Sequence, residues 1–378
     1  MSRLIDVDVT IIGGGIVGCA TAAAVARDGR DVVLLEREPR LATGVTSRNS
    51  EVAHGGMYYP PGTLKARCCV RGRRLLKDLC TAAGVGYREC GKLVVAVDED
   101  EQAALSDLHE RGLANQVERL SLIGRAELKR LEPEVTAVAA LRSDATGILD
   151  AEGAAGAYAR QARAAGVQVM TDAAVSGLAR EVDGWRVTVD RRAGEGWSHR
   201  SRWVINCAGL RADEVAALAG AGGVCPRQRW VKGNYFSVSS RHAGRVSRLV
   251  YPVPPAGRDT LGVHLCLDLQ GQLRLGPDFE PVERAEDYAV EPSRAVGFFA
   301  GARRFLPFLE PDDLAPAFSG LRPKIDTDEP FADFQVRREG GDLEGLVNLV
   351  GIDSPGLTAA PALAELVAGI IDGGEAPT

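Results

Sequence analysis

No stretch of the 378-residue sequence carries the ~18 uninterrupted apolar residues that a membrane-spanning helix needs. The apolar run from Val9 to Ala26 is broken by four glycines, and Asp6 and Asp8 precede it where a secretory signal would carry basic residues. We therefore expect neither a transmembrane segment nor a secretory leader.

The sequence also has no C-x-x-C pair and no excess of positive charge. The spacings of its eight cysteines match no zinc-binding template, so we expect reduced thiols, a cytoplasmic protein and no metal site. The formal net charge of −6 argues against nucleic acid or an anionic membrane as a partner. A hydrophobic content of 45% is typical of a globular protein, and the length predicts about two or three domains.

The start of the sequence has the pattern of a dinucleotide-binding βαβ unit. The β-branched run 7–12 predicts a buried parallel strand, and GGGIVG after it satisfies G-x-G-x-x-G with Gly13, Gly15 and Gly18. The Ala-rich stretch CATAAAVARDG predicts a helix that Gly29 stops. The three motif glycines would allow a tight turn, a close approach to a pyrophosphate and close helix–strand packing.

A second predicted strand, DVVLLE, ends in the acid Glu36. This residue follows Gly18 by 18 positions, close to the spacing of a ribose-binding carboxylate. It would accept hydrogen bonds from ribose hydroxyls, while the N-terminus of the preceding helix would face the phosphates. These residues predict an ADP-containing cofactor and leave NAD and FAD both open.

The remaining sequence predicts further α/β units and then a separate sheet. Helices are expected over 64–86, 99–111, 125–131 and 152–165, the first with apolar residues on one face and Arg and Lys opposite. VQVMTDAAVSGL, WRVTVD and WVINCAG predict a strand, a β-meander and a return to a parallel strand. YFSV, GVHLCLD and LRLGPD predict antiparallel strands. The C-terminal part predicts a strand, a turn and a helix over 359–371.

Motifs along nearly the whole chain resemble those of the FAD-dependent oxidases and dehydrogenases of the D-amino-acid oxidase superfamily. In chain order they read IIGGGIVG, TSRNSEVAHGGMYYPPGTLKAR, GKLVVAV, NCAGLRAD, YPVPP, LGVHL and GIDSPGLTAAPALA. Within the superfamily the sequence is most similar to the L-2-hydroxyglutarate dehydrogenase/oxidase group, of which YYPPGTLKAR and GKLVVAV are the most specific signs. SGLRPKIDTDEPF is nearer the glycine-oxidase pattern.

The resemblance implies an α/β fold in which a Rossmann-type FAD-binding domain is interleaved with an α+β substrate domain built on an antiparallel sheet. The expected FAD-binding segments are 1–88, 146–222 and 334–378. The expected substrate-binding segments are 89–145 and 223–333.

The resemblance also implies which residues contact FAD. The helix after GIDSPGLT would direct its N-terminus at the flavin, where its dipole stabilises the anionic reduced ring; an ordinary capped terminal helix is the alternative. The expected cofactor-binding residues are Gly13, Gly15, Ile16, Gly18, Glu36, Arg37, Thr46, Ser47, Asn49, Ser50, Val175, Ala208, Gly209, Arg322, Gly351, Ile352, Gly356, Leu357 and Thr358.

Residues 46–61, TSRNSEVAHGGMYYPP, would line the flavin and one wall of the substrate cavity. Their short polar side chains and turn-forming backbone suit a close approach. Arg48 and Glu51 either serve the site or form a solvated, mutually paired couple. Because Arg48 stands where relatives often carry a histidine, no histidyl–flavin bond is available there, and we expect non-covalent FAD.

Oxidation of an alcohol needs a base near neutral pH that takes the hydroxyl proton as hydride leaves Cα for flavin N5. Imidazole suits this task, and His54 and His264 are the candidates, although His54 could also be a satisfied structural imidazole. His109, His199 and His242 lie in polar, helical or loop contexts, and we predict them to be surface residues.

Arg322, in FSGLRPKI, matches the arginine with which amino-acid-oxidising relatives bind the substrate carboxylate. A planar guanidinium binds a carboxylate through two parallel hydrogen bonds. The alternative is a structural ion pair with Asp326 or Asp328. The second carboxylate of a diacid would need one of four further side chains: Arg48, Tyr58, Tyr59 or Lys324.

The predicted function is FAD-dependent oxidation of a small L-2-hydroxy acid, similar to L-2-hydroxyglutarate, to the 2-oxo acid. Oxygen, a quinone or an electron-transfer flavoprotein would re-oxidise the flavin. An amino-acid or amine oxidase or dehydrogenase is the first alternative, for which no base is strictly required because a neutral amine has already lost its proton. A non-catalytic dinucleotide-binding sensor is the second.

Overall fold

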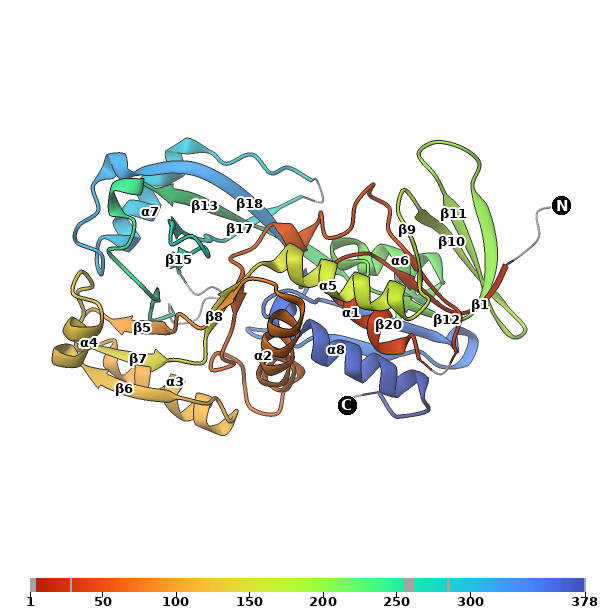
Figure 1. Ribbon diagram of the computed structural model, residues 1–378, viewed down its shortest axis with the longest axis horizontal. Coiled ribbons are helices and arrows are strands. Elements are labelled where there is room, and N and C mark those ends of the chain that lie inside the picture. Colours follow the sequence, from red (N-terminus) through yellow and green to blue (C-terminus); the bar gives the residue numbers. More distant parts are fainter. Residues whose placement is uncertain (1–4, 28, 255–261, 284–285, 377–378) are drawn as a thin grey trace.

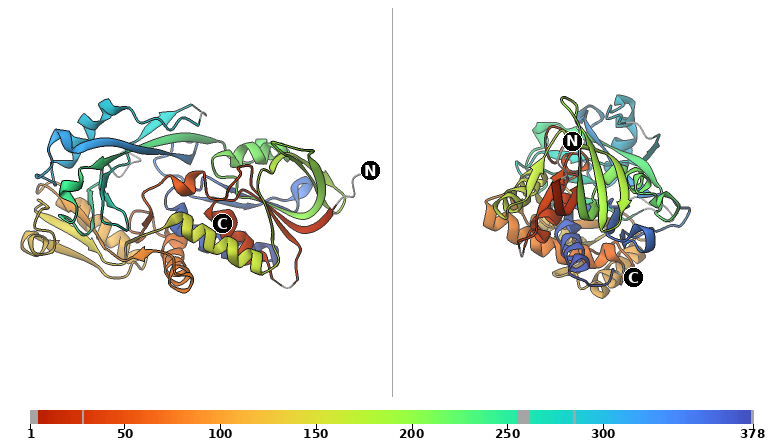
Figure 2. Two further views of the ribbon diagram at one scale, coloured as in Figure 1. Left: turned by 45° about the horizontal axis from the view of Figure 1, so that its top comes forward. Right: turned by 90° about the vertical axis from the view of Figure 1, so that its right-hand side faces the viewer.

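The computed structural model describes residues 5–27, 29–254, 262–283 and 286–376. Two large β-sheets, each with its own helices, form the two ends of an elongated molecule (Figure 1). The long strands β13 and β18 run from one end toward the middle, as the additional views also show (Figure 2). Residues far apart in the sequence therefore meet between the sheets.

The first sheet contains the N-terminal βαβ unit. Strand β1 (Ile5–Ile12) pairs in parallel with β2 (Val32–Leu35) on one side and β12 (Trp197–Asn206) on the other. The strand order is β10-β11-β12-β1-β2-β9, and β20 pairs with β12 and with β19. Its other strands are β9 (Gln168–Met170), β10 (Ala174–Glu181), β11 (Gly184–Asp190), β19 (Gln335–Arg338) and β20 (Leu346–Val350).

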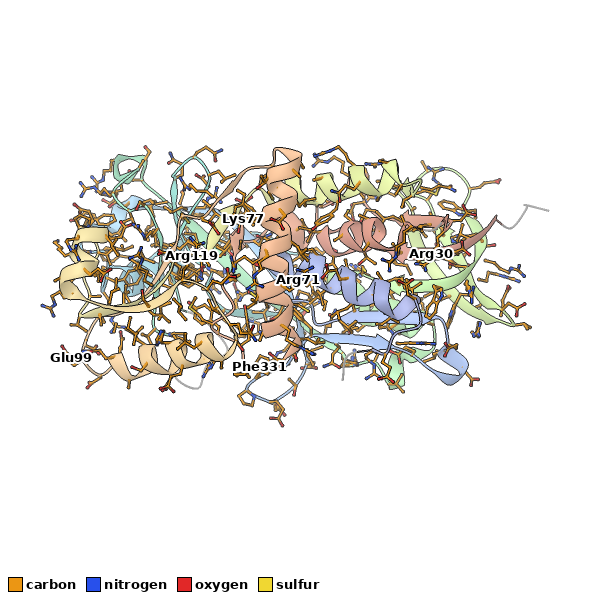
Figure 3. The ribbon with its side chains drawn as sticks, turned by 60° about the horizontal axis from the view of Figure 1, so that its bottom comes forward. Arg30, Arg71, Lys77, Glu99, Arg119 and Phe331 are labelled. Atoms are coloured by element: carbon orange, nitrogen blue, oxygen red, sulfur yellow. The ribbon has the colours of Figure 1, made fainter. Side chains whose placement is uncertain are left out.

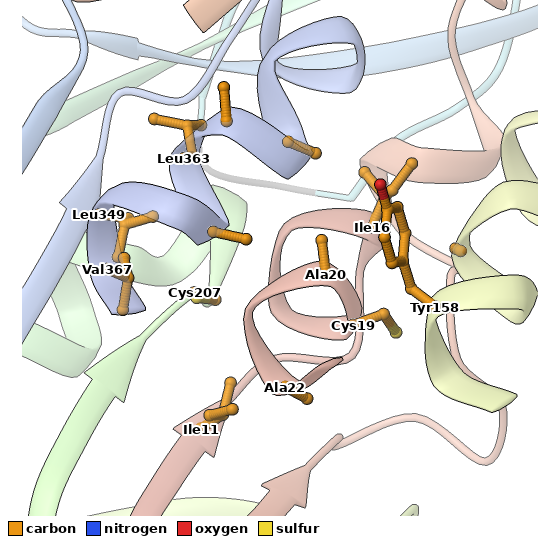
Figure 4. Close-up of a cluster of buried hydrophobic side chains, with 14 of the residues drawn as sticks. Ile11, Ile16, Cys19, Ala20, Ala22, Tyr158, Cys207, Leu349, Leu363 and Val367 are labelled. Carbon is orange, nitrogen blue, oxygen red and sulfur yellow. The ribbon is translucent and has the colours of Figure 1, made fainter. Parts of the chain in front are cut away.

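Three alanine-rich helices pack together beside this sheet: α1 (Ile16–Val25), α5 (Ala151–Ala164) and α8 (Gly356–Ile371). Their small side chains let the helix axes approach closely. Figure 4 shows α1 between the other two, with Ile16 against Tyr158 of α5 and Leu363 on α8. Helix α1 ends at Val25 rather than continuing to Gly29, which instead takes a left-handed φ of 73° in the turn that leads into β2.

Helix α2 (Leu64–Ala83) crosses α8 at a backbone contact, because a Cβ on Gly72 would lie 2.1 Å from the carbonyl oxygen of Thr358. Arg71 and Lys77 lie on its exposed side (Figure 3). The predicted separation of an apolar face from an opposite Arg and Lys face is wrong for Lys65 and Arg73, which are 6% and 2% exposed. Both cations are paired, and pairing makes their burial tolerable: Lys65 with Asp353 and Arg73 with Glu118.

The second sheet is mainly antiparallel, apart from a parallel pairing of β5 with β14. Its order is β17-β13-β16-β15-β14-β5-β7-β6, with β18 paired along β13. The strands are β5 (Lys92–Ala96), β6 (Leu120–Gly124), β7 (Ala139–Ser143), β13 (Gln228–Val238), β14 (Leu249–Pro252), β15 (Leu265–Leu267), β16 (Leu273–Leu275), β17 (Glu280–Val282) and β18 (Leu314–Ile325).

A small third sheet lies between the two large ones and contains β3 (Val52–Ala53), β8 (Gly147–Leu149) and β4 (Tyr87–Arg88). The remaining helices are α3 (Gln102–Ala114), α4 (Arg125–Leu131), α6 (Ala212–Leu218) and α7 (Ala295–Ala302). The C-terminal helix α8 begins at Gly356, three residues before its predicted start, so the turn GIDSP lies directly at its N-terminus.

Two histidines that we predicted to be surface residues are buried. His199 is 3% exposed and lies 2.8 Å from the hydroxyl of Thr10. His242 is 4% exposed and lies 2.8 Å from the carboxylate of Asp313. A buried imidazole needs such a partner, and the partners come from positions too distant in the sequence to be recognised there.

All eight cysteines are free thiols. Across the described residues, no helix combines the length and apolar character that crossing a membrane requires. The same residues contain no group of three or more His, Cys, Asp or Glu side chains placed to hold a metal ion.

Candidate active site

A cavity of about 1230 Å³ lies between the two large sheets. Pockets for drug-sized ligands are usually about 300–1000 Å³, so this one has room for a dinucleotide together with a small substrate. Its lining comes from the β1–α1 turn, the end of β2, the loop after it, α3, β18 and the turn before α8. The predicted site residues that line it include Ile16, Arg37, Tyr59, Val175, Ala208, Gly209, Ile352, Gly356 and Leu357.

The glycine turn at the start of α1 is tightly packed. A Cβ on Gly13 would lie 2.4 Å from the carbonyl oxygen of Cys207, and one on Gly18 would lie 1.9 Å from that of Gly13. Gly15 caps α1 without a side chain, and the first turn of the helix carries no acidic residue. Gly13 and Gly15 line the cavity, whereas Gly18 serves the contact between helix and strand.

The carboxylate of Glu36 lies at the end of β2, beside this turn. It accepts hydrogen bonds from the amide of Gly14 at 2.6 Å and from that of Glu38 at 2.8 Å. Glu36 lines the cavity. Its position at the C-terminal end of a parallel strand is where a ribose-binding acid of a dinucleotide fold lies.

The loop that follows is held by its own polar side chains. The hydroxyl of Thr46 accepts from the amide of Ile16 at 3.0 Å, and the amide group of Asn49 donates to the carbonyls of Val45 and Thr46. The hydroxyl of Ser50 lies 2.8 Å from that of Tyr235. Thr46, Asn49 and Ser50 line the cavity, while the hydroxyl of Ser47 donates to the carbonyl of Gly44, and Ser47 is not among the lining residues.

Arg48 and Glu51 do not pair with each other. The guanidinium of Arg48 lies 4.0 Å from the ring centroid of Tyr288, and the carboxylate of Glu51 lies 3.8 Å from Arg274. The backbone of Arg48 is pressed against β18, because a Cβ on Gly320 would lie 2.0 Å from its carbonyl oxygen. Arg48 lines the cavity.

The start of α8 fixes the position of His54. The hydroxyl of Thr358 accepts from the amide of His54 at 3.0 Å and donates to the carbonyl of Val52 at 3.1 Å. The amide of Gly351 donates to the side chain of Gln228 at 2.8 Å. Thr358 and Gly351 therefore support the cavity from behind and do not line it.

Asp353, in the turn before α8, pairs with two lysines that also line the cavity. Its carboxylate oxygens lie 2.7 Å from Nζ of Lys65 and 3.0 Å from Nζ of Lys324. Burial opposes the ionisation of Asp353, but the two ammonium groups hold its pKa below the usual value. Three charges with a net charge of +1 thus lie beside the N-terminus of α8.

His54 and His264 both line the cavity and are 9% and 4% exposed. Nδ1 of His264 lies 2.8 Å from the carbonyl of Gly262, so this nitrogen donates and leaves Nε2 as the acceptor. Within the described part of the chain, no hydrogen-bond partner reaches Nδ1 of His54. Burial, with a smaller contribution from Lys92, lowers the pKa of His54 well below its ordinary value and that of His264 to about 3.

Arg322 enters the same cavity from β18. One Nη atom donates to the carbonyl of Asp278 at 2.7 Å. Neither of the two aspartates considered from the sequence, Asp326 and Asp328, forms an ion pair with it among the described residues. The guanidinium therefore keeps donors for a carboxylate ligand.

Comparison with known proteins identifies the chain. The family model described as FAD dependent oxidoreductase matches residues 8–370. The chain belongs to this family. The FAD-dependent oxidoreductase is 35% identical to the mitochondrial L-2-hydroxyglutarate dehydrogenase of Arabidopsis thaliana over 401 residues, covering 96% of this chain and 83% of that protein. It is 34% identical to L-2-hydroxyglutarate dehydrogenase of Escherichia coli K12 over 287 residues, covering 74% and 66%.

Solved structures agree with this family. L-alpha-glycerophosphate oxidase from Mycoplasma pneumoniae, with FAD bound, has a TM-score of 0.87 and 28% identity, covering 98% of this chain and 95% of that one. Glycine oxidase from Geobacillus kaustophilus has a TM-score of 0.78 at 20% identity, covering 98% and 95%, and shows the shared fold. The predicted superfamily, fold class, enzyme class and FAD cofactor are confirmed.

The residues of this oxidoreductase fit FAD. Only glycine is tolerated at positions 13 and 18, and the side-chain-free cap at Gly15 leaves room for a pyrophosphate at the N-terminus of α1. Glu36 would bind the ribose, and the loop 45–50 and the start of α8 would flank the flavin. The cavity is continuous from Glu36 to Arg322, which is what a cofactor spanning both ends requires.

Replacing Glu36 by alanine is expected to weaken FAD binding roughly 10- to 100-fold, because a hydrogen bond to a charged group is lost. Titration of apoprotein with FAD, followed by quenching of flavin fluorescence, measures the change. Glu365→Ala is a matched control, since Glu365 is exposed and pairs with Arg71, away from the cavity lining. Equal FAD affinity in both variants would contradict a role for Glu36.

Several lining residues were not recognised from the sequence. Lys65 and Asp353 were missed because each looks like a solvent-facing residue in its local pattern, and only the fold brings them together. Arg111 of α3 lines the cavity and donates to the carbonyl of Tyr58 at 3.3 Å. Its helix was predicted, but no pattern in the sequence places that helix at the cavity.

Proposed function

We propose that this FAD-dependent oxidoreductase oxidises a small L-2-hydroxy acid of the L-2-hydroxyglutarate type to the 2-oxo acid. The observation that carries the proposal is the presence of Arg322, His54 and His264 in one cavity with the cofactor-binding turn. The relatives named L-2-hydroxyglutarate dehydrogenase support the substrate class.

Arg322 would bind and orient the 1-carboxylate of the substrate. Its guanidinium is anchored through one Nη atom to the carbonyl of Asp278, so its orientation is set before the substrate arrives. A bound carboxylate placed this way fixes Cα, which carries the reacting hydroxyl and hydrogen.

One of the two imidazoles would take the proton of the substrate hydroxyl. The lowered pKa values of His54 and His264 mean that both rings are neutral at pH 7, as a proton acceptor must be. The accepting atom would be Nδ1 of His54 or Nε2 of His264. FAD, when bound, accepts the hydride that leaves Cα with its electron pair.

The second carboxylate of a diacid would meet a positively charged lining. Lys324 and Lys65 carry a net charge of +1 together with Asp353, and Arg48, Arg111 and Asp107 also line the cavity, so basic side chains outnumber acidic ones in this wall. The side chains of Tyr58 and Tyr59 complete this wall, and burial raises the pKa of both phenols, so they remain neutral donors. This composition favours a dianionic substrate over a neutral one.

We further propose that the first sheet and its helices bind FAD while the second sheet binds the substrate, with the segment boundaries predicted above. Arg48 in place of a histidine supports a non-covalent cofactor. The free thiols support a cytoplasmic location. Oxygen, a quinone and an electron-transfer flavoprotein all stay open as acceptors.

The test is an anaerobic screen in which the loss of flavin absorbance is followed after addition of a substrate. L-2-hydroxyglutarate is expected to bleach the flavin, and D-2-hydroxyglutarate, L-lactate, glycine and L-proline are expected to do so much more slowly. Faster bleaching by an amino acid would establish the amine-oxidising alternative. Glycine oxidase, which has the same fold, is an enzyme of that type. No bleaching by any hydroxy acid would overturn the proposal.

A further inference from the structure

Lys92 is a buried lysine for which the mechanism above has no use. It is the first residue of β5, an interior strand of the second sheet, and lies in register with Ser143 of β7 and Leu249 of β14. Its exposed fraction is 0%, and it does not line the cavity. A lysine at such a position is unusual because a buried charge needs a partner.

Among the residues that the structure describes, the amine of Lys92 has no such partner. No hydrogen-bond acceptor reaches Nζ and no carboxylate pairs with it within the described ranges. Its contacts are aromatic: Nζ lies 3.8 Å from the ring centroid of Tyr251 and 5.2 Å from that of Tyr58. Contacts with aromatic faces stabilise a protonated amine, but by less free energy than the loss of hydration on burial costs it.

Tyr251 links this amine to the cavity. Its ring stacks on the imidazole of His264, with centroids 3.6 Å apart and an angle of 20° between the planes. His54 lies close enough to both groups that Lys92 and His264 each contribute to its lowered pKa, after burial. Lys92 and His264 therefore contact the same aromatic ring, and Lys92 lies near the two imidazoles that line the cavity.

The other titratable groups around Lys92 carry no compensating charge. Burial raises the pKa of every thiol and phenol that faces it, which keeps them neutral near pH 7: Tyr58, Cys69, Cys90, Tyr251 and Cys266. Burial also lowers the pKa of Lys92 itself to about 7. The amine and the two imidazoles thus share a region in which one positive charge is already unfavourable and a second is more so.

We propose that Lys92 is a positioning residue for the reaction: its amine, buried without a hydrogen-bond partner among the described residues and in contact with the Tyr251 ring that stacks on His264, competes with His54 and His264 for protons from solvent and so keeps both imidazoles neutral until the substrate hydroxyl delivers its proton. The role of the proton-accepting imidazoles rests on the proposed function. The coupling between Lys92 and the imidazoles rests only on the structure.

The first test measures the imidazoles directly in the FAD-loaded, oxidised protein. With only five histidines in the chain, ¹³C-labelled histidine gives an NMR titration in which His54 and His264 are assigned from their glutamine variants. In Lys92→Met, both rings are expected to titrate at higher pH than in the wild type. Lys77→Met is the matched control, because Lys77 is exposed and pairs with Glu89. Unchanged histidine titrations in Lys92→Met overturn the proposal whatever the substrate proves to be.

The second test follows the pH dependence of flavin reduction under anaerobic conditions with the best substrate from the screen. The acidic limb of the rate profile is expected to move to higher pH in Lys92→Met, while the rate on the alkaline plateau changes little. Lys92→Arg, whose charge is permanent, is expected to keep the acidic limb at or below the wild-type position. A uniform fall in rate without movement of the limb would show a purely structural role and overturn the proposal.

Thermal unfolding separates this role from simple structural support. The pKa of Lys92 is about 7 in the folded protein and near 10.5 when unfolded, so between these values the unfolded state binds more protons and wild-type stability rises with pH. Lys92→Met does not have the free-energy cost of burying this amine. Its melting temperature is therefore expected to exceed that of the wild type at pH 6.5, and the difference is expected to shrink toward pH 10. A lower melting temperature at pH 6.5 would mean that Lys92 stabilises the fold, and would contradict the proposal.

Discussion

Replacing Arg322 by methionine is expected to lower kcat/KM for the substrate by roughly 10²- to 10³-fold, which corresponds to about 3 to 4 kcal/mol. Methionine keeps an unbranched side chain but offers no donor, so the substrate carboxylate would enter a buried site without its partner. The carbonyl of Asp278 would also lose the donor that it now accepts from at 2.7 Å. Arg322→Lys is expected to recover only part of the loss, because an ammonium cannot form two parallel hydrogen bonds to a carboxylate.

Stopped-flow measurement of flavin reduction over a range of substrate concentrations resolves this effect into binding and reaction. Arg229→Met is a suitable control, since Arg229 is half-buried on the neighbouring strand β13 and does not line the cavity. A change of less than about threefold in Arg322→Met, well under 1 kcal/mol, would remove Arg322 from the site.

Replacement of the proton-accepting histidine by glutamine is expected to slow flavin reduction by a hydroxy acid by ~10²-fold or more, the usual contribution of a general base. Glutamine approximates the size of imidazole but cannot take up a proton. His54→Gln and His264→Gln are compared because both rings line the cavity and both are neutral near pH 7. The variant with the larger loss identifies the base.

The two variants also distinguish a hydroxy acid from an amine as the substrate. An amine that binds in its neutral form needs no base, so its oxidation would be slowed far less by either replacement. His109→Gln provides the control, since His109 lies on α3 and does not line the cavity. If His54→Gln, His264→Gln and the double variant all reduce flavin at the wild-type rate, the proposed chemistry is wrong.

Much of the fold could be predicted because local patterns and long-range packing agree. The C-terminal half of strand β1, from Val9 to Ile12, is buried between β2 and β12, and the glycines that follow it are required by contacts that the dinucleotide motif already implies. The antiparallel second sheet was recognisable from short strands separated by turns. Helix ends were less certain: α1 ends before Gly29 because a turn, rather than the helix, uses that glycine.

Residues of the candidate site were recognised from the sequence only where the residue type itself indicates a chemical role. Arg322, His54 and Glu36 were recognised in this way. Lys65 was not, because its burial depends on a partner that lies far away in the sequence, Asp353. A charged residue in an amphipathic pattern is normally assigned to solvent, and no local signal reports that the fold will supply a counter-ion.

The contact between Gly320 and Arg48 limits how this enzyme can change its substrate. Since the two backbones touch, we expect the loop 45–50 and strand β18, which carries Arg322, to move together. The distance between the flavin and a carboxylate bound by Arg322 would then be set by the scaffold. Longer or bulkier hydroxy acids must find their space elsewhere, along α3, so directed evolution of chain-length preference should begin at Ala104, Leu108 and Arg111.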